Sequence, residues 1–515
     1  MIQKLNITIF ICFCFTSLHA FQTPIKITIH ADEEKALISR HIYGHFAEHL
    51  GRCIYDGIYI GDNKEVDHIN GHRKDIIEAL KKLKVPNLRW PGGCFADTYH
   101  WMDGIGPKNK RPKIVNIWWG GETEDNSFGT HEFLEFCELI NAEPYLAANV
   151  GSGTVRELMD WLDYLNNDKG SDMSELRKKN GRLIPYNVKM WGVGNEAWGC
   201  GGNMTADFYS NIYRQYATFM TDWSNSSKIY RIASGATDGD YSWTESLMKN
   251  IPHNMLSGVA LHHYSVISWS DKGPAIGFTE KQYFKTMQEA LKMDEFIKGH
   301  STIMDKYDPD KKIGLIVDEW GGWYNTEKGD AALYQQNTMR DAVLAGVSLN
   351  IFNNHAERVK GANIAQMVNV LQSVILTNKK KMILTPTYHV MRMYNVHQDA
   401  KKLNYYMHQS PSYSYDKNEL EALSISASKT PSGQINISIV NIDLHKSQKI
   451  ALEIRGEDYT VFESEILKGK SIDDHNSFEN PNKVIPTKLE ILKEKNDTIE
   501  LVLPPQSVVM IKGNK

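Results

Sequence analysis

From about residue 41 to 385, the chain alternates short apolar or β-branched runs with amphipathic stretches. The amphipathic stretches place apolar residues on one helical face, as Ile76, Ile77, Leu80 and Leu83 do. This alternation is typical of repeated strand–helix units. The predicted strands are His41–Phe46, Asn87–Trp90, Tyr145–Val150, Val188–Val193, Ile232–Ser234, Gly258–His263, Gly314–Val317 and Asn350–Asn353. Eight such units predict an α/β fold, a (β/α)8 TIM barrel with enlarged loops.

A doubly wound open sheet is the competing layout for such an alternation. Its best indication is Gly151-Ser152-Gly153, which follows one predicted strand and precedes a helical pattern. The dinucleotide-binding fingerprint requires a third glycine, and Arg156 occupies that position. The barrel is therefore the favoured architecture.

After about residue 388 the pattern changes to repeated strand-like runs separated by turn-rich segments. The predicted strands are Ala422–Ala427, Ile435–Asn441, Ile450–Ile454, Thr460–Glu465, Lys488–Leu492, Thr498–Leu503 and Val508–Lys512. Many short strands without intervening helices predict an all-β, jelly-roll-like sandwich. We expect a barrel over 41–388, a sandwich over 389–515, and an N-terminal strand within 21–40 that joins the sandwich.

The first twenty residues have the pattern of a signal peptide. Lys4 precedes an apolar stretch from Ile7 to Phe15, and the small residue Ala20 follows. The stretch is too short to span a bilayer. We therefore expect residues 1–20 to be removed and the protein to be exported, either periplasmic or secreted.

Composition narrows the class of partner. The chain of 515 residues is 41% hydrophobic and 23% charged, as folded globular proteins are. Its formal net charge of −4, without a dense basic block, gives no basis for binding nucleic acid or an anionic membrane. Cys53, Cys94, Cys137 and Cys200 have neither metal-ligand spacing nor the density of a disulfide scaffold, so we expect stability not to depend on disulfides.

Two glutamates each end a predicted barrel strand in a Trp- and Gly-rich setting. Glu196 ends Trp191-Gly192-Val193-Gly194-Asn195-Glu196, and Glu319 lies in Ile316-Val317-Asp318-Glu319-Trp320. By our count they end strands four and seven, whose carboxyl ends face the active site of a barrel. A carboxylate pair suits glycoside hydrolysis, in which one group protonates the leaving oxygen and the other attacks the anomeric carbon or activates water. The alternative is that each caps a helix or pairs with Arg89.

Five motifs in order resemble those of the α-L-arabinofuranosidases of glycoside hydrolase family 51, and the resemblance covers nearly the whole chain after the first forty residues. The motifs are Gly44-His45-Phe46-Ala47-Glu48-His49-Leu50-Gly51, Leu88-Arg89-Trp90-Pro91-Gly92-Gly93-Cys94-Phe95, Gly194-Asn195-Glu196, Asp318-Glu319-Trp320 and Asn363-Ile364-Ala365-Gln366-Met367-Val368-Asn369-Val370-Leu371.

The resemblance implies a retaining, two-step mechanism on arabinose-containing oligo- or polysaccharides. Glu319 would be the nucleophile and Glu196 the acid/base, with their carboxyl groups about 5–5.5 Å apart. It also implies sugar contacts from Glu48, Asn195 and Gln366, positioning of the nucleophile by Arg89 and Tyr264, and an aromatic wall at Trp119, although Trp118 is adjacent.

Two departures from the family pattern affect the expected specificity. Cys94 stands after the paired glycines where many relatives have Asn, and a thiol is a weaker donor to a sugar. The segment Ala197–Met204 follows the acid/base and differs from the loop expected in better-known members. Linkage preference is therefore left open.

Several alternatives stay open at this point. Within the same clan, an endo-glucanase or β-xylosidase would use the same two glutamates, and a non-catalytic carbohydrate-binding protein is a further reading. His41, His45 and His49 suggest a zinc site, but the His-Glu-x-x-His order is absent, so we expect neither metal nor organic cofactor. One of His262 and His263 should face the pocket. Family resemblance also implies a homo-oligomer, with a hexamer as the commonest form.

Overall fold

A computed structural model describes residues 23–223, 228–326, 332–495 and 498–515. The predicted signal peptide, residues 1–20, lies outside the described residues. Among the helices described, none is both long and apolar enough to cross a membrane.

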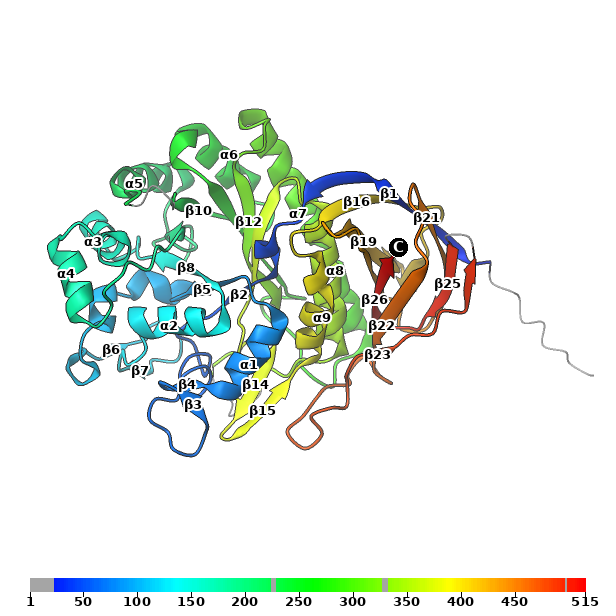
Figure 1. The fold of residues 1–515 in the computed structure, drawn as a ribbon, viewed down its shortest axis with the longest axis horizontal. Coiled ribbons are helices and arrows are strands. Elements are labelled where there is room, and N and C mark those ends of the chain that lie inside the picture. The colour runs from blue at the N-terminus through cyan, green and yellow to red at the C-terminus, as the bar shows by residue number, and fades with distance from the viewer. Residues whose placement is uncertain (1–22, 224–227, 327–331, 496–497) are drawn as a thin grey trace, which may run out of the picture.

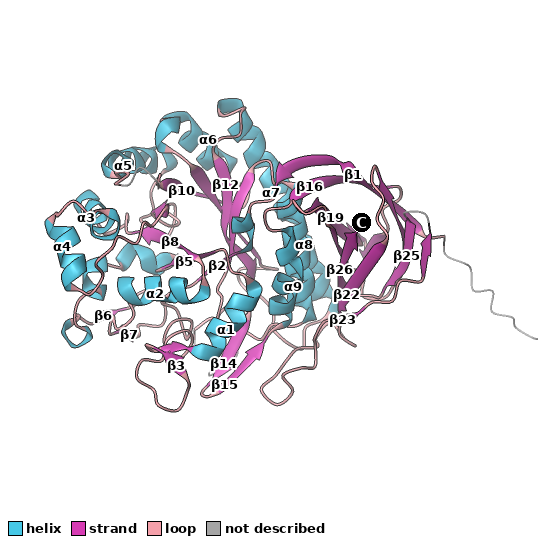
Figure 2. Cartoon of the chain, viewed as in Figure 1, coloured by secondary structure: helices cyan, strands magenta, loops and turns pink. Residues whose placement is uncertain are grey.

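The larger part of the molecule is a closed barrel of eight parallel strands with helices around it, which confirms the predicted fold class (Figures 1 and 2). The barrel strands are β2 (Gly44–Phe46), β5 (Asn87–Trp90), β8 (Glu143–Ala148), β9 (Met190–Val193), β10 (Tyr230–Thr237), β11 (Gly258–Ser265), β12 (Gly314–Gly322) and β13 (Val359–Ile364). Because β13 pairs with β2 and so closes the ring, the carboxyl ends of all eight strands meet at one face.

The helices are amphipathic where they cover the barrel. They are α1 (Lys74–Leu83), α2 (Thr130–Ile140), α3 (Val155–Asn166), α4 (Asp172–Lys179), α5 (Ala206–Phe219), α6 (Tyr241–Asn250), α7 (Glu280–Tyr307), α8 (Met339–Asn354) and α9 (Pro386–Tyr394). In α1 the predicted apolar face, including Ile76 and Leu80, is buried. Side-chain N-caps such as Thr154 and Thr205 begin several of them.

The predicted eighth strand, Asn350–Asn353, is wrong. These residues form the last turns of α8, and the eighth strand is β13. The helix lies between the barrel and the C-terminal sheet and contacts both (Figure 2). Residues Met339 to Asn353 are therefore all buried, polar ones such as Arg340 and Asp341 included, and a helix buried on every side lacks the one-sided pattern that distinguishes helix from strand.

The C-terminal part is a curled ten-stranded sheet of mostly antiparallel strands, as the predicted all-β sandwich requires. Its strands are β1 (Ile25–Leu37), β16 (Lys401–Met407), β19 (Leu423–Lys429), β20 (Ile435–Asn441), β21 (Gln448–Arg455), β22 (Val461–Leu467), β23 (Thr487–Lys488), β24 (Lys493–Lys495), β25 (Thr498–Leu503) and β26 (Ser507–Asn514). Strand β16 was not predicted, and β23 is shorter than the predicted Lys488–Leu492.

Strand β1 begins the described chain but lies in this C-terminal sheet, where it appears as the blue arrow beside β16 and β21 in Figure 1. It pairs antiparallel with β16 and parallel with β21. Ile27 and Ile29 are fully buried in the hydrophobic core of this sheet. A strand from near the start of the chain therefore folds together with strands from its C-terminal part.

Short two-stranded sheets lie outside the barrel and the ten-stranded sheet. They are β3 (His68–Ile69) with β4 (His72–Arg73), β6 (Ile114–Val115) with β7 (Thr123–Glu124), β14 (Ile375–Asn378) with β15 (Lys381–Leu384), and β17 (Ser412–Tyr415) with β18 (Asn418–Glu421). The β6–β7 hairpin bears directly on the site described next, because the chain between its strands carries Trp119.

Candidate active site

Glu196 and Glu319 meet at the carboxyl end of the barrel. Glu196 follows β9, the fourth barrel strand, and Glu319 lies near the end of β12, the seventh. One carboxylate oxygen of each, together with a ring nitrogen of His262, lie within 4.8 Å of one another. His262 is brought there because it pairs directly with Glu319 in the register of β11 and β12.

The Glu319 carboxylate is held at both oxygens. Arg89 Nη1 donates to Oε1 at 2.9 Å, and the Tyr264 hydroxyl donates to Oε2 at 2.8 Å. The Glu319 side chain is 6% exposed, so these bonds fix its orientation out of bulk water. The two residues expected to position Glu319 therefore do contact it.

Glu196 has a different environment. Its Oε1 lies 2.9 Å from His262 Nδ1, and its side chain is 18% exposed, three times the exposure of Glu319. Burial raises the pKa of Glu196 despite the lowering effect of His262. A carboxyl group that retains its proton and also reaches solvent is suited to exchanging that proton with a bound molecule.

The backbone at Glu196 is in the left-handed region, with φ of 39°, which is uncommon for a residue with a side chain. Buried Asp97 holds the preceding residue, because its Oδ2 accepts from the Asn195 N–H at 3.2 Å. The Ala197 N–H on the other side donates to Ser234 Oγ at 3.0 Å. A side chain at Gly201 would place its Cβ 1.8 Å from the Asn195 carbonyl oxygen, so this tight turn requires glycine there.

Glu48 is the centre of a second group of polar contacts. Its Oε1 accepts from Trp119 Nε1 at 2.9 Å and from the Phe95 N–H at 3.2 Å, and its Oε2 accepts from Gln366 Nε2 at 2.8 Å. Burial raises the pKa of Glu48 to about 7. The backbone at Gly93 passes so close that a Cβ would lie 3.0 Å from both carboxylate oxygens, which explains the glycine at this position.

The adjacent tryptophans have different environments. Trp119 is half-buried and donates its ring N–H to Glu48, whereas Trp118 is 38% exposed. Asn116 helps to fix Trp119 by accepting from its backbone N–H at 3.1 Å. Of the two, Trp119 is thus the residue that faces the site.

Asn195 contacts Arg89 rather than either glutamate. Its Oδ1 accepts from Arg89 Nη2 at 2.6 Å, and its Nδ2 donates to Cys200 Sγ at 3.9 Å. Arg89 therefore orients both Asn195 and Glu319.

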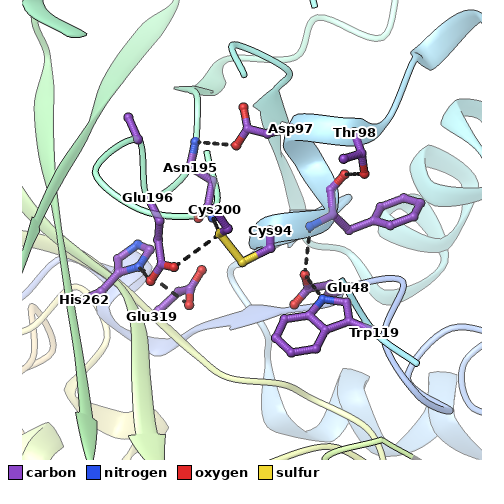
Figure 3. Close-up of a disulfide and its surroundings, with 12 residues drawn as sticks. Glu48, Cys94, Asp97, Thr98, Trp119, Asn195, Glu196, Cys200, His262 and Glu319 are labelled. Carbon is purple, nitrogen blue, oxygen red and sulfur yellow. Dashed lines mark hydrogen bonds and ion pairs between the residues drawn. A yellow bond between two sulfur atoms is a disulfide. The ribbon is translucent and has the colours of Figure 1, made fainter. Parts of the chain in front are cut away.

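Cys94 is bonded to Cys200 in a disulfide across 106 residues of sequence, so the thiol expected at position 94 is absent (Figure 3). This bond was not predicted from the sequence, because pairing depends on the 5.4 Å Cα separation that folding creates. Figure 3 shows the disulfide between the Glu48–Trp119 contact and the cluster of Glu196, His262 and Glu319. Cys53 and Cys137 are free and buried.

Asp318 and Tyr145, two buried residues around the carboxylates, were not predicted as site residues, and His262 was predicted only as one of two alternatives. His262, not His263, faces the two glutamates, and its Nε2 lies 3.1 Å from Asp318 Oδ1. Burial alone would lower the pKa of His262, but the neighbouring carboxylates raise it to about 10. Asp318 also accepts from Tyr145 at 2.6 Å. Asp318 could have been identified from the sequence because it belongs to the Asp-Glu-Trp motif. Nothing in the sequence around Tyr145 marks it as a site residue.

Two family models match this chain. The model described as alpha-L-arabinofuranosidase 1 domain matches residues 79–275, and that described as alpha-L-arabinofuranosidase C-terminal domain matches residues 318–507. An "Intracellular exo-alpha-L-arabinofuranosidase" of Bacteroides ovatus is 49% identical over 494 residues, which cover 95% of this chain and 96% of that protein. A "Probable alpha-L-arabinofuranosidase C" of Aspergillus fumigatus is 35% identical, over 87% of this chain and 90% of the relative.

Solved structures of arabinofuranosidases are also similar to this chain. The GH51 arabinofuranosidase from Xanthomonas axonopodis pv. citri superposes with a TM-score of 0.94 at 42% identity, covering 96% of this chain and all of that one. The arabinose complex of the α-L-arabinofuranosidase from Thermotoga maritima gives a TM-score of 0.84 at 32% identity, with 95% and 99% coverage.

The predicted export is wrong. The Bacteroides ovatus relative is similar along almost its whole length and is named as an intracellular enzyme, which contradicts a periplasmic or secreted protein. The prediction rested on one lysine and a short apolar run between Ile7 and Phe15. So short a run is weak evidence for a signal peptide, because apolar segments of this length also occur in the cores of folded proteins.

Proposed function

Because this chain belongs to the α-L-arabinofuranosidases of glycoside hydrolase family 51, we propose that it removes single terminal α-L-arabinofuranosyl groups with retention of configuration. In this proposal Glu319 is the nucleophile and Glu196 the acid/base. The observation that carries it is the contrast between the two carboxylates: Glu319 is fixed by Arg89 and Tyr264, while Glu196 has a raised pKa and reaches solvent.

In the first step, a Glu319 oxygen attacks the anomeric carbon as the bond to the leaving oxygen breaks, and Glu196 gives its proton to that oxygen. This forms an arabinosyl ester of Glu319. In the second step, the Glu196 carboxylate takes a proton from water, the water oxygen attacks the anomeric carbon, and the ester bond breaks. Carboxylate oxygens within 4.8 Å support retention, because inverting enzymes separate the two carboxyl groups by about 6.5–9.5 Å to admit a water.

An exo mode of action is supported by the enclosed polar side of the site. Glu48 is 1% exposed and Gln366 is 2% exposed, and both Trp119 and Gln366 donate hydrogen bonds to Glu48. Together with the Asn195 amide, these groups offer donors and acceptors for the hydroxyls of one furanose ring. We propose arabinan- or arabinoxylan-type oligosaccharides as substrates and a homo-oligomer, with a hexamer expected from the family, as the assembly; light scattering measures the latter.

The test of the function is release of arabinose from 4-nitrophenyl α-L-arabinofuranoside, with β-D-xylopyranoside and β-D-glucopyranoside analogues alongside. We expect selective turnover of the arabinofuranoside, and NMR of early product should show the α-anomer. Preference for the xyloside or glucoside would retain the two glutamates but overturn the substrate. Early β-anomer would overturn retention, and binding without turnover would indicate a carbohydrate-binding protein.

A further inference from the structure

The disulfide beside the acid/base places three metal-ligating atoms together. The sulfurs of Cys94 and Cys200 and a carboxylate oxygen of Glu196 lie within 4.8 Å of one another, and all three residues are partly exposed. Cys200 Sγ is 3.5 Å from Glu196 Oε2. Two cysteine sulfurs and a carboxylate form a donor set that Zn²⁺ and Cd²⁺ accept, but only when the sulfurs are thiolates.

We propose that reduction of the Cys94–Cys200 disulfide creates a binding site for one thiophilic divalent cation, held by both thiolates and Glu196. A dithiol supplies two electrons and two protons, becomes a cyclic disulfide, and leaves two cysteine thiols. The cation then displaces both thiol protons and takes up the Glu196 carboxylate. The effect on activity rests on the acid/base role proposed above for Glu196. The occupied site stops hydrolysis because the metal-bound carboxylate cannot carry a proton.

The geometry needs little change beyond breaking the S–S bond. With Zn–S of about 2.3 Å and Zn–O of about 2.1 Å, a tetrahedral site places sulfur and oxygen about 3.6 Å apart. Cys200 Sγ and Glu196 Oε2 are already 3.5 Å apart. Once reduction has broken the S–S bond, rotation of the two cysteine side chains can bring the sulfurs to the separation of about 3.8 Å that a tetrahedral site requires.

Neighbouring groups orient the carboxylate for this role. His262 Nδ1 binds Oε1 of Glu196, so Oε2 is the oxygen that faces the sulfur. Such an outer partner commonly fixes a ligating carboxylate. Asn195 Nδ2 is 3.9 Å from Cys200 Sγ and can donate to the thiolate that reduction creates. Three protein ligands leave the fourth position for water, on the exposed side of Glu196.

The test is a titration with Cd²⁺, whose thiolate complexes absorb in the ultraviolet, and it needs no substrate. The full chain carrying Cys12→Ser and Cys14→Ser, which removes the two cysteines that precede the described residues, is reduced with dithiothreitol, separated from it under argon, and titrated beside its oxidised form. We expect one Cd²⁺ per chain with thiolate-to-metal absorption in the reduced protein and none in the oxidised protein. Arabinofuranosidase activity of the reduced protein should fall in step with this absorption and return when EDTA is added.

Variants identify the ligands. Cys94→Ser should lose the absorption, whereas Cys53→Ala/Cys137→Ala, which removes the two buried free thiols, should keep it. Glu196→Gln should weaken Cd²⁺ binding by at least about tenfold, since even outer-sphere partners contribute that much. Absence of the absorption in the reduced wild-type protein, or its persistence in Cys94→Ser, would overturn the proposal; unchanged affinity in Glu196→Gln would remove the carboxylate from the site. If the oxidised enzyme released no arabinose, the proposed function would fail while the Cd²⁺ titration still tested the site.

Discussion

Tyr264 donates a 2.8 Å hydrogen bond to Oε2 of Glu319, and Oε1 of the same carboxylate accepts a hydrogen bond from Arg89 Nη1 at 2.9 Å. Tyr264 is on β11 and Glu319 on β12, and parallel pairing of these strands brings the two side chains together. The hydroxyl and the guanidinium each bond one carboxylate oxygen and so fix the orientation of the group. This fixed orientation is what the proposed role of Glu319 as nucleophile requires.

Removing the proposed nucleophile should abolish hydrolysis. Glu319→Ala is expected to lower kcat by at least about 10⁴-fold while the circular dichroism spectrum stays unchanged. Added azide should restore turnover and give the β-configured arabinosyl azide, because one displacement replaces two. The matched control, Glu245→Ala, loses a surface ion pair with Lys306 and a hydrogen bond from Tyr307 and should keep full activity. Retained activity in Glu319→Ala would show that another group attacks the sugar.

Removing the acid/base should make the rate depend on the leaving group. Glu196→Ala is expected to hydrolyse 2,4-dinitrophenyl arabinofuranoside, whose leaving group needs no proton, far better than natural arabinosides. Steady-state kinetics on aryl arabinofuranosides of rising leaving-group pKa measure the dependence. An equal loss on every leaving group would exclude Glu196 as the acid.

The tryptophan pair offers a matched comparison. Trp119→Phe keeps an aromatic ring but removes the N–H that Glu48 accepts, so we expect kcat/KM to fall by about tenfold or more, in the range of a bond to a charged group. Trp118→Phe changes an exposed ring and should alter kcat/KM by no more than about twofold. Equal effects from the two substitutions would contradict the assignment of Trp119.

The pH dependence should report the contact between His262 and Glu196. The hydrogen bond and charge of His262 lower the pKa of Glu196, so His262→Gln should raise that pKa further. Because the first step needs protonated Glu196, the basic limb of kcat/KM should move to higher pH. His263→Gln is the control, since His263 bonds Asp238 and the Glu289 carbonyl instead. A basic limb that does not move would show that His262 has only a structural role.

Loss of the disulfide should lower stability. It joins residues 106 apart, and removing a crosslink over so long a loop costs about 2–5 kcal/mol. Cys94→Ser/Cys200→Ser should therefore unfold at lower temperature than the oxidised protein, in calorimetry without reductant. Addition of dithiothreitol should lower the melting temperature of the wild-type protein but not that of the double variant. Equal melting temperatures without reductant would show that the bond does not constrain the fold.

The sequence by itself determined the barrel, the family and the two glutamates. Strands such as β11 and β20 contain short apolar or β-branched runs that can be recognised locally, and the motifs around Glu196 and Glu319 are contiguous. Glu48, Arg89, Trp119, Asn195, Tyr264 and Gln366, identified only through the family motifs, do lie together, but their roles stay proposals.

Tertiary structure alone decided the rest, because those features depend on residues distant in sequence. The helix α8 is buried on every side because it packs between barrel and sheet, so its sequence has no exposed polar face to mark it as a helix. The Cys94–Cys200 bond forms only after two barrel loops approach each other. The choice of His262 over His263 follows from which face of β11 carries the two glutamates and which face packs against α7, where His263 contacts the Glu289 carbonyl; strand alternation alone leaves that choice open.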